Sequence, residues 1–209
     1  GAVTVTATYI PRIYELTVNS GSGDGNYIYG DTVAITADPA PIGMEFDAWV
    51  VNIGSPIIAS NNSSSTTLTM AAGSATVIAT YRPSIYNLTI NSGTGSGSYE
   101  YGMPVTIIAN AAPTGMVFDF WLVNSGTPAI LDTIASNTTL TMPAGEATAT
   151  AIYRAAIYQL NVNSGIGDGN YVYGENVTIT ADPAPIGQDF DVWLVNSGTP
   201  TIAMVYDSS

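Results

Sequence analysis

The chain has 209 residues, with sixteen Asp or Glu against three Arg, no Lys, no His and no Cys, and a formal net charge of −13. This charge repels phosphate and anionic lipid headgroups, which argues against nucleic-acid partners and membrane-surface binding. No apolar run is long enough for membrane insertion. Without His, Cys or Lys the usual general bases, thiol nucleophiles and Schiff-base formers are missing, so composition predicts a protein that is not an enzyme.

The surface composition points to a location outside the cell. Only 9% of the residues are charged, and Thr, Ser, Asn and Gly supply most of the polar surface. A neutral, hydroxyl-rich surface is typical of secreted bacterial and archaeal proteins, so we expect an extracellular or cell-surface protein. A cytoplasmic chain that happens to lack Cys is the alternative.

The chain opens with alternating residues that predict a half-buried strand. Val3, Val5, Ala7 and Tyr9 share one face of residues 1–12, and three Thr share the other. The β-branched composition suits a sheet.

Seven further strands are predicted in the residues after this segment. We expect them at residues 14–19, 26–29, 33–37, 44–52, 57–59, 66–70 and 75–81. The Gly-rich text NSGSGDG and the segment DPAPIG predict the two largest turns. No stretch shows a helical period, so the fold class is all-β, with β-sandwich-like and β-grasp-like domains both open.

The whole pattern recurs every 72 residues without a gap, as Trp49, Trp121 and Trp193 show. A period of this length indicates a small domain copied in tandem. The predicted organisation is a closing strand of a preceding repeat at 1–12, then repeats at 13–84, 85–156 and 157–209. The predicted core residues of the three repeats are Phe46, Trp49, Phe118, Trp121, Phe190 and Trp193. The third repeat lacks its last strands, and the short joints predict a semi-rigid rod.

One local pattern leaves two interpretations open. Phe46 and Trp49 lie three residues apart, so a regular strand would send them to opposite faces. Either a bulge lies between them or the strand is covered on both sides. Asp47 recurs in all three repeats as a possible acceptor for turn amides or for the indole N–H.

The three Arg side chains lie at or near the predicted joints between repeats. Arg82 and Arg154 occupy equivalent positions, and Arg12 lies two residues later in its own joint. This placement favours ion pairs between repeats, and solvated charges of little energetic value are the alternative.

Calcium is the only cofactor for which the sequence offers candidate ligands. Hard oxygens lie near the Gly-rich loops of repeats one and three, at Asp24, Asn26, Asp31, Asp168, Asn170 and Glu175. Repeat two replaces both carboxylates and keeps the rest of the pattern. We therefore expect no cofactor, and we expect these residues to serve as turn residues.

Two further surface features are candidates for modification or binding. Asn-x-Ser/Thr sequons occur at Asn61, Asn62, Asn87, Asn137 and Asn176 and would accept N-glycans where the source glycosylates. Tyrosines alternate along the predicted hairpins at Tyr27, Tyr29, Tyr99, Tyr101, Tyr171 and Tyr173. These rings would either pack in the core or bind sugars or a neighbouring subunit.

The ordered motifs YxLTVNSGxGxGxYxYG, VTITAxPxPxG, FDxW, TTLTMPAG and ATATAIY run through the chain. In this order they resemble the divergent internalin B-type repeats of bacterial and archaeal surface proteins. The resemblance implies a non-catalytic β module in stalks, adhesins or cell-surface assemblies. The segment between FDxW and TTLTM is longer here than is usual for that family.

The phase of the repeat generates the functional hypothesis. Residues 1–12 match the closing strand at 73–84, and the third repeat has no such strand. We expect residues 2–10 to insert into the third repeat of another copy, giving a head-to-tail homopolymer in an extracellular filament or stalk. Residues 203–207 would then stand in for the other missing strand. The alternative is that the chain is part of a long surface adhesin that binds glycan or a host protein.

Overall fold

The structure is a computed structural model, and it describes residues 1–203. These residues form strands, turns and extended segments without a helix. The chain divides into two compact units, one made of Gly1–Ala112 with Phe118–Arg154 and the other of Pro113–Val117 with the chain from Ala155 onward. Each unit is described by itself.

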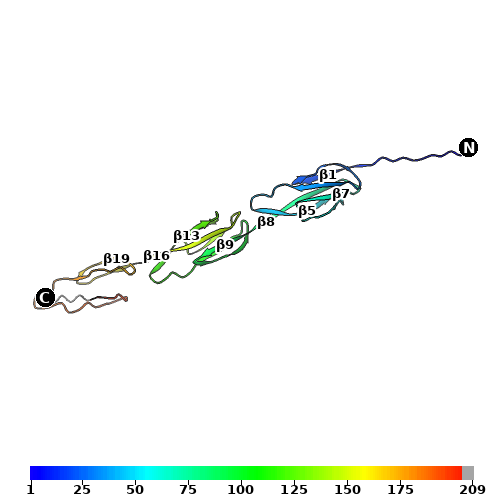
Figure 1. The fold of residues 1–209 in the computed structure, drawn as a ribbon. Helices are drawn as coiled ribbons and strands as arrows, with labels where there is room; N and C mark the ends of the chain where they lie inside the picture. The colour runs from blue at the N-terminus through cyan, green and yellow to red at the C-terminus, as the bar shows by residue number, and fades with distance from the viewer. Residues whose placement is uncertain (204–209) are drawn as a thin grey trace. The chain divides into compact units, whose positions relative to one another are not determined.

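The first repeat consists of two four-stranded sheets (Figure 1). The first sheet has the order β3-β1-β8-β5 and the second has the order β2-β4-β7-β6. The strands of the first sheet are β1 (Ile13–Asn19), β3 (Gly25–Ile28), β5 (Met44–Ile53) and β8 (Ala75–Pro83). Those of the second are β2 (Gly21–Ser22), β4 (Thr32–Ala37), β6 (Ile57–Ile58) and β7 (Ser65–Thr69).

The two sheets enclose one apolar core. Alternate residues of β1, β4, β7 and β8 point inward, and Leu16, Ile35, Leu68 and Val77 are each no more than 1% exposed. Trp49 joins this core from β5. Because successive strand residues face opposite sides, the Thr-rich positions of the same strands face solvent. The arrangement is a β-sandwich, which decides between the two topologies that the sequence left open.

The second repeat has the same topology, with sheets ordered β11-β9-β16-β13 and β10-β12-β15-β14. The first of these contains β9 (Ile85–Asn91), β11 (Gly97–Glu100), β13 (Met116–Ser125) and β16 (Ala147–Ala155). The second contains β10 (Gly93–Thr94), β12 (Pro104–Ala109), β14 (Ala129–Ile130) and β15 (Asn137–Thr141). Its core repeats the first one, with Leu88, Ile107, Trp121 and Leu140 at most 2% exposed.

The third repeat is incomplete, as the sequence predicts. It retains two separate two-stranded pairings, β17 with β19 and β18 with β20. Their bounds are β17 (Ile157–Leu160), β18 (Gly165–Ile166), β19 (Gly169–Val172) and β20 (Thr180–Ala181). Residues 188–197, which correspond to β5, form no strand. In the first repeat β5 pairs with β8 alone within its sheet, and no described residues of the third repeat take the place of β8 beside this segment.

A β-bulge accounts for the Phe46 and Trp49 spacing. The register between β5 and β8 shifts between Phe46 and Ala48, which leaves Asp47 as the extra residue. The shift places both rings on one face, with centroids 6.0 Å apart and planes tilted by 57°. The same pair recurs at 5.8 Å for Phe118 and Trp121 and at 5.6 Å for Phe190 and Trp193. The bulge interpretation is therefore confirmed.

The expected ion pairs between repeats are wrong. Arg82 on β8 instead pairs with Glu45 on β5 of its own repeat, with 2.8 Å between Nε and Oε1, and its other contact is Asp47 at 4.0 Å. Arg154 pairs in the same way with Asp119 at 3.3 Å. Glu45 and Arg82 are direct cross-strand neighbours, which explains the choice of partner. These half-exposed pairs contribute little stability.

The core description predicts a large difference between two neighbouring apolar positions on β7 and β6. Leu68→Ala removes a side chain with 0% exposure, whereas Ile57→Ala removes one that is 70% exposed. We expect Leu68→Ala to lower the free energy of unfolding by about 2–5 kcal/mol and Ile57→Ala by about 0.5 kcal/mol or less. Urea unfolding followed by tryptophan fluorescence measures both, and equal losses would contradict the proposed core.

Candidate functional site

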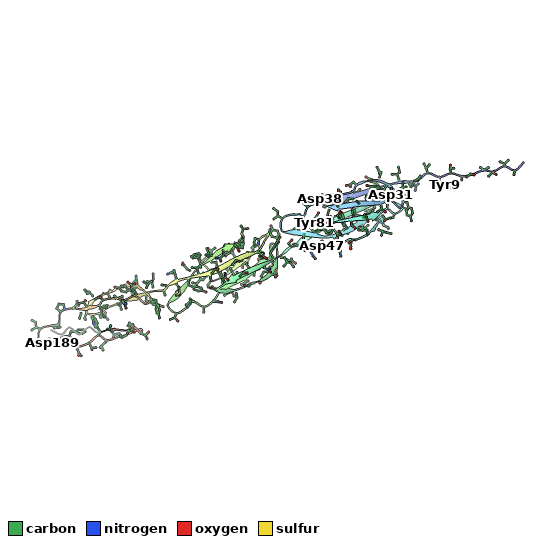
Figure 2. All side chains as sticks on the ribbon, viewed as in Figure 1. Tyr9, Asp31, Asp38, Asp47, Tyr81 and Asp189 are labelled. Atoms are coloured by element: carbon green, nitrogen blue, oxygen red, sulfur yellow. The ribbon has the colours of Figure 1, made fainter. Side chains whose placement is uncertain are left out.

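The N-terminal segment is a strand sequence without a sheet. Residues 1–12 form no ladder among the described residues and are exposed throughout. Val3 and Val5 are each 89% exposed and Tyr9 is 91% exposed. Figures 1 and 2 show the segment leading away from β1, with Tyr9 outside the first repeat.

The third repeat contains an open groove of about 930 Å³. Apolar side chains line this groove: Leu160 at the end of β17, and Val162, Ile179, Phe190 and Trp193 from segments outside the strands. In the complete repeats the counterparts of these residues are mostly buried, and Trp49 is 3% exposed. Here Phe190 is 54% exposed, and Leu160, Val162, Ile179 and Trp193 are only half-buried. An apolar surface that forms a core in two repeats is therefore open in the third.

In a complete repeat the closing strand fills the corresponding space. In the first repeat β8 lies between β1 and β5, pairing parallel with β1 and antiparallel with β5. Its inward residues Ala75, Val77 and Ala79 are at most 4% exposed. The 72-residue period aligns them with Val3, Val5 and Ala7. The free segment thus carries the inward-facing residue pattern of the strand that fills this space in a complete repeat.

The counterpart of Tyr9 in the first repeat is Tyr81, whose hydroxyl has two backbone acceptors. In the first repeat the Tyr81 hydroxyl donates to the carbonyl of Asp38 at 2.7 Å and to that of Ser20 at 3.3 Å (Figure 2). Burial, and then the negative charge of Asp38, raise the pKa of Tyr81 above its ordinary value. Ser164 and Asp182, which correspond to Ser20 and Asp38, both line the groove.

The carboxylates considered for calcium act as turn caps. Asp24 Oδ1 accepts the backbone N–H of Val18 at 2.8 Å, and Asp31 Oδ2 accepts that of Ile28 at 3.0 Å. In the third repeat Asp168 and Glu175 accept the N–H groups of Val162 and Val172 at 2.8 and 3.0 Å. Asn26 and Asn170 lie on the outer hairpin strands β3 and β19. Among the residues that the structure describes, no three His, Cys, Asp or Glu gather as a metal site would require.

Ser96 shows that the turn cap does not depend on a carboxylate. Its Oγ accepts the N–H of Ile90 at 2.8 Å, at the position that Asp24 occupies in the first repeat. This equivalence explains why the second repeat tolerates the loss of the acid. The absence of a cofactor remains a prediction.

The alternating tyrosines divide into two sets with different contacts. Tyr27, Tyr99 and Tyr171 pack over their own Gly-rich loops, donating to the carbonyls of Gly23, Gly95 and Gly167 at 3.0–3.1 Å. Tyr29, Tyr101 and Tyr173 follow the hairpin strands and are more exposed, at 72%, 40% and 56%. Tyr27, Tyr99 and Tyr171 therefore do not form a continuous ladder of exposed rings for sugar binding.

The predicted sequons all lie at the surface. Asn61, Asn62, Asn87, Asn137 and Asn176 are exposed, so a glycan would meet no steric barrier from the core at these positions. Their modification remains a prediction.

Sequence comparison places these repeats in a known family. A family profile described as the divergent InlB B-repeat domain matches residues 14–85, 86–157 and 158–208. The chain belongs to the divergent InlB B-repeat family. Comparisons with curated proteins and with solved structures found no match.

Membership of the InlB B-repeat family indicates a general role for the chain. Repeats of this family are typically associated with the cell surface, and their tandem arrangement is that of a structural repeat protein. In the part of the chain that the structure describes, no helix is long and apolar enough to cross a membrane.

The turn-cap assignment predicts different outcomes for two substitutions at one position. Asp24→Ala leaves the partly buried N–H of Val18 without an acceptor and should lower the free energy of unfolding by about 1–3 kcal/mol. Asp24→Ser copies the second repeat and should recover most of that loss. Urea unfolding with and without millimolar Ca²⁺ measures both effects. Stability that rises with Ca²⁺ in the wild-type chain and not in Asp24→Ser would contradict the assignment.

Proposed function

We propose that this chain is a non-catalytic structural subunit of an extracellular filament or cell-surface stalk. Copies join head to tail when residues 2–10 of one copy enter the groove of the third repeat of the next. The observation that carries the proposal is the match between an exposed closing strand and a repeat core that is open where that strand would lie.

The strand register of the complete repeats supplies the expected register of the joint. In the first repeat Val77 lies opposite Val18 on β1 and Val51 on β5. By the repeat period, Val5 then lies between Val162 and Val195 of the receiving copy. Tyr9 lies opposite Phe190, as Tyr81 lies opposite Phe46.

The energetics favour filling the groove. Burying Val3, Val5 and Tyr9 contributes roughly 4–7 kcal/mol before the cost of ordering the segment. The donated strand also gains a backbone ladder on both edges, because β8 is hydrogen bonded on both sides. Left unpaired, the segment is an edge that invites non-specific association.

Chain direction is also consistent with head-to-tail growth. Within the chain, β8 ends at Pro83 and β9 begins at Ile85, so a closing strand runs almost directly into the next repeat. The N-terminal segment runs into β1 after Pro11 and Arg12 in the same way. A donated strand with the polarity of β8 therefore puts the first repeat of the donor where a next repeat would follow. A contact of this kind does not close on itself and extends as a filament.

Among the described residues of the third repeat, none takes the position that β7 has beside β4 in the first repeat. The suggested replacement, residues 203–207, lies outside the described residues except for its first member.

The adhesin alternative remains a prediction without a distinctive site. The three repeats carry nearly interchangeable loops, such as NSGSGDGNYIYG and NSGIGDGNYVYG. Interchangeable modules favour a scaffold over a ligand-binding surface that occurs once.

The register gives a direct covalent test in a chain that has no native Cys. Thr6 and Leu194 correspond to Ile78 and Val50, which lie directly opposite each other. We expect Thr6→Cys with Leu194→Cys to form disulfide-linked oligomers on oxidation, seen as a ladder on a non-reducing denaturing gel. The matched control, Thr4→Cys with Leu194→Cys, places the sulfurs two residues out of register, beyond the roughly 4.4–6.8 Å Cα separation of disulfides.

The side chains on the donated strand give a second test of the same joint. Val5→Asp puts a charge into the groove and should abolish filaments in negative-stain microscopy, whereas Thr6→Asp, on the opposite face, should leave them intact. A wild-type chain that stays monomeric at high concentration, or a ladder that is equally strong in the out-of-register control, would refute strand donation. In either case the better explanation is that the groove is filled by a strand from a neighbouring repeat of the same polypeptide.

A further inference from the structure

Each complete joint contains a Gly–Tyr contact that the strand pairing does not require. The turn that ends at Gly43 lies against Tyr101 of the following repeat, so closely that a Cβ on Gly43 would collide with the Tyr101 ring. Gly43 also has a φ of +73°, which disfavours any other residue. Two constraints therefore require glycine at this position.

The backbone of the joint is tied by two further hydrogen bonds. The N–H of Ser84 donates to the carbonyl of Gly43 at 2.8 Å. The carbonyl of Ser84 in turn accepts the N–H of Tyr101 at 2.9 Å. One linker residue thus connects the turn of one repeat to the hairpin of the next, and the aromatic ring covers the connection.

The same arrangement occurs a second time, within the second compact unit. Gly115, with a φ of +74°, lies under the ring of Tyr173. Ala156 donates to the carbonyl of Gly115 at 2.8 Å and accepts from Tyr173 at 2.9 Å. The linker residue is Ser84 in one joint and Ala156 in the other, whereas both joints have a Gly and a Tyr at the same positions. The contact therefore does not depend on the side chain of the linker residue.

The repeat period identifies a third, divided set of the same groups. Tyr29 corresponds to Tyr101 and is 72% exposed. Gly187 corresponds to Gly43, has a φ of +80°, and has nothing within 4 Å of the position of a Cβ. Arg12 is the linker residue, and among the described residues its N–H and carbonyl have no backbone partner.

We infer that Tyr29, Arg12 and Gly187 form the joint between two copies of this chain. The Tyr29 ring of the incoming copy covers Gly187 of the receiving copy. The N–H of Arg12 donates to the carbonyl of Gly187, and its own carbonyl accepts the N–H of Tyr29. The inference rests on the proposed strand donation and adds a second contact surface to it, on the turn beside the groove.

The occupant is a second copy because both halves are on this chain and match its internal joints. Residues 9–12 connect the donated strand to the first repeat, so strand insertion brings Tyr29 to the position that Tyr101 holds relative to Gly43. If the donor copy had a small residue in place of Tyr29, its N-terminal strand would still fill the groove, but the turn at Gly187 would stay uncovered. The ring therefore helps to select a correctly oriented copy over an unrelated β-strand.

The test compares the divided joint with the internal ones. Tyr29→Ala and Gly187→Val each remove one half, and we expect each to weaken self-association by about tenfold or more, as truncation of a central aromatic contact does. Tyr29→Phe keeps the ring and should associate like the wild type. The matched control Tyr101→Ala removes the same ring from an internal joint and should leave self-association within about threefold of the wild type.

Sedimentation equilibrium gives the association constant of each variant, and the Thr6→Cys with Leu194→Cys crosslink reports strand insertion separately. If the wild type crosslinks in register and Tyr29→Ala and Gly187→Val associate like the wild type, the joint is refuted and strand donation stands. If the wild type neither associates nor crosslinks, strand donation itself fails. Circular dichroism checks that each variant keeps its sheets.

Discussion

The fold of each repeat depends on its closing strand. In the first repeat β8 is the only strand that joins β1 to β5, and its inward face supplies Ala75, Val77 and Ala79 to the core. Among the described residues of the third repeat none takes the place of this strand, the segment that corresponds to β5 forms no strand, and Trp193 is only half-buried. The closing strand comes last in its repeat. The same strand therefore completes the core of its repeat and connects it to the next repeat.

Under the proposed strand donation, this dependence links the stability of the third repeat to the assembly of copies. A strand that carries Val3, Val5, Ala7 and Tyr9 in the pattern of β8 is free at one end of the chain, and its groove is open in the third repeat. Under the proposed strand donation, the same alternation that builds a core within a repeat provides the joint between copies. The chain has no Cys and no Lys, so the proposed joint would use neither disulfides nor Lys-dependent isopeptide bonds. Buried apolar area and backbone pairing would stabilise that joint.

Local patterns in the sequence predicted the strands well, because period-2 alternation is a property of each strand alone. The seven strands expected in the first repeat all occur, and only the two-residue β2 was missed. The order of the strands and the Gly43–Tyr101 contact depend on residues far apart in the chain, which alternation does not reveal. The spacing of Phe46 and Trp49 indicated a bulge as one of two interpretations, and the pairing of β5 with β8 was needed to choose it. The sequence around Asp24 fits a calcium ligand as well as the expected turn residue, because the Val18 N–H that it accepts is a backbone group that carries no sequence signal.

Hydrogen–deuterium exchange across residues 2–10 tests the central claim most directly, because exchange reports whether these backbone amides are paired. In the dilute chain they should exchange at the rate of an unstructured peptide. At concentrations where filaments form, they should become protected together with residues 188–197, which gain their missing partner strand. Filaments in which residues 2–10 still exchange freely would contradict strand donation, even if the copies associate through another surface.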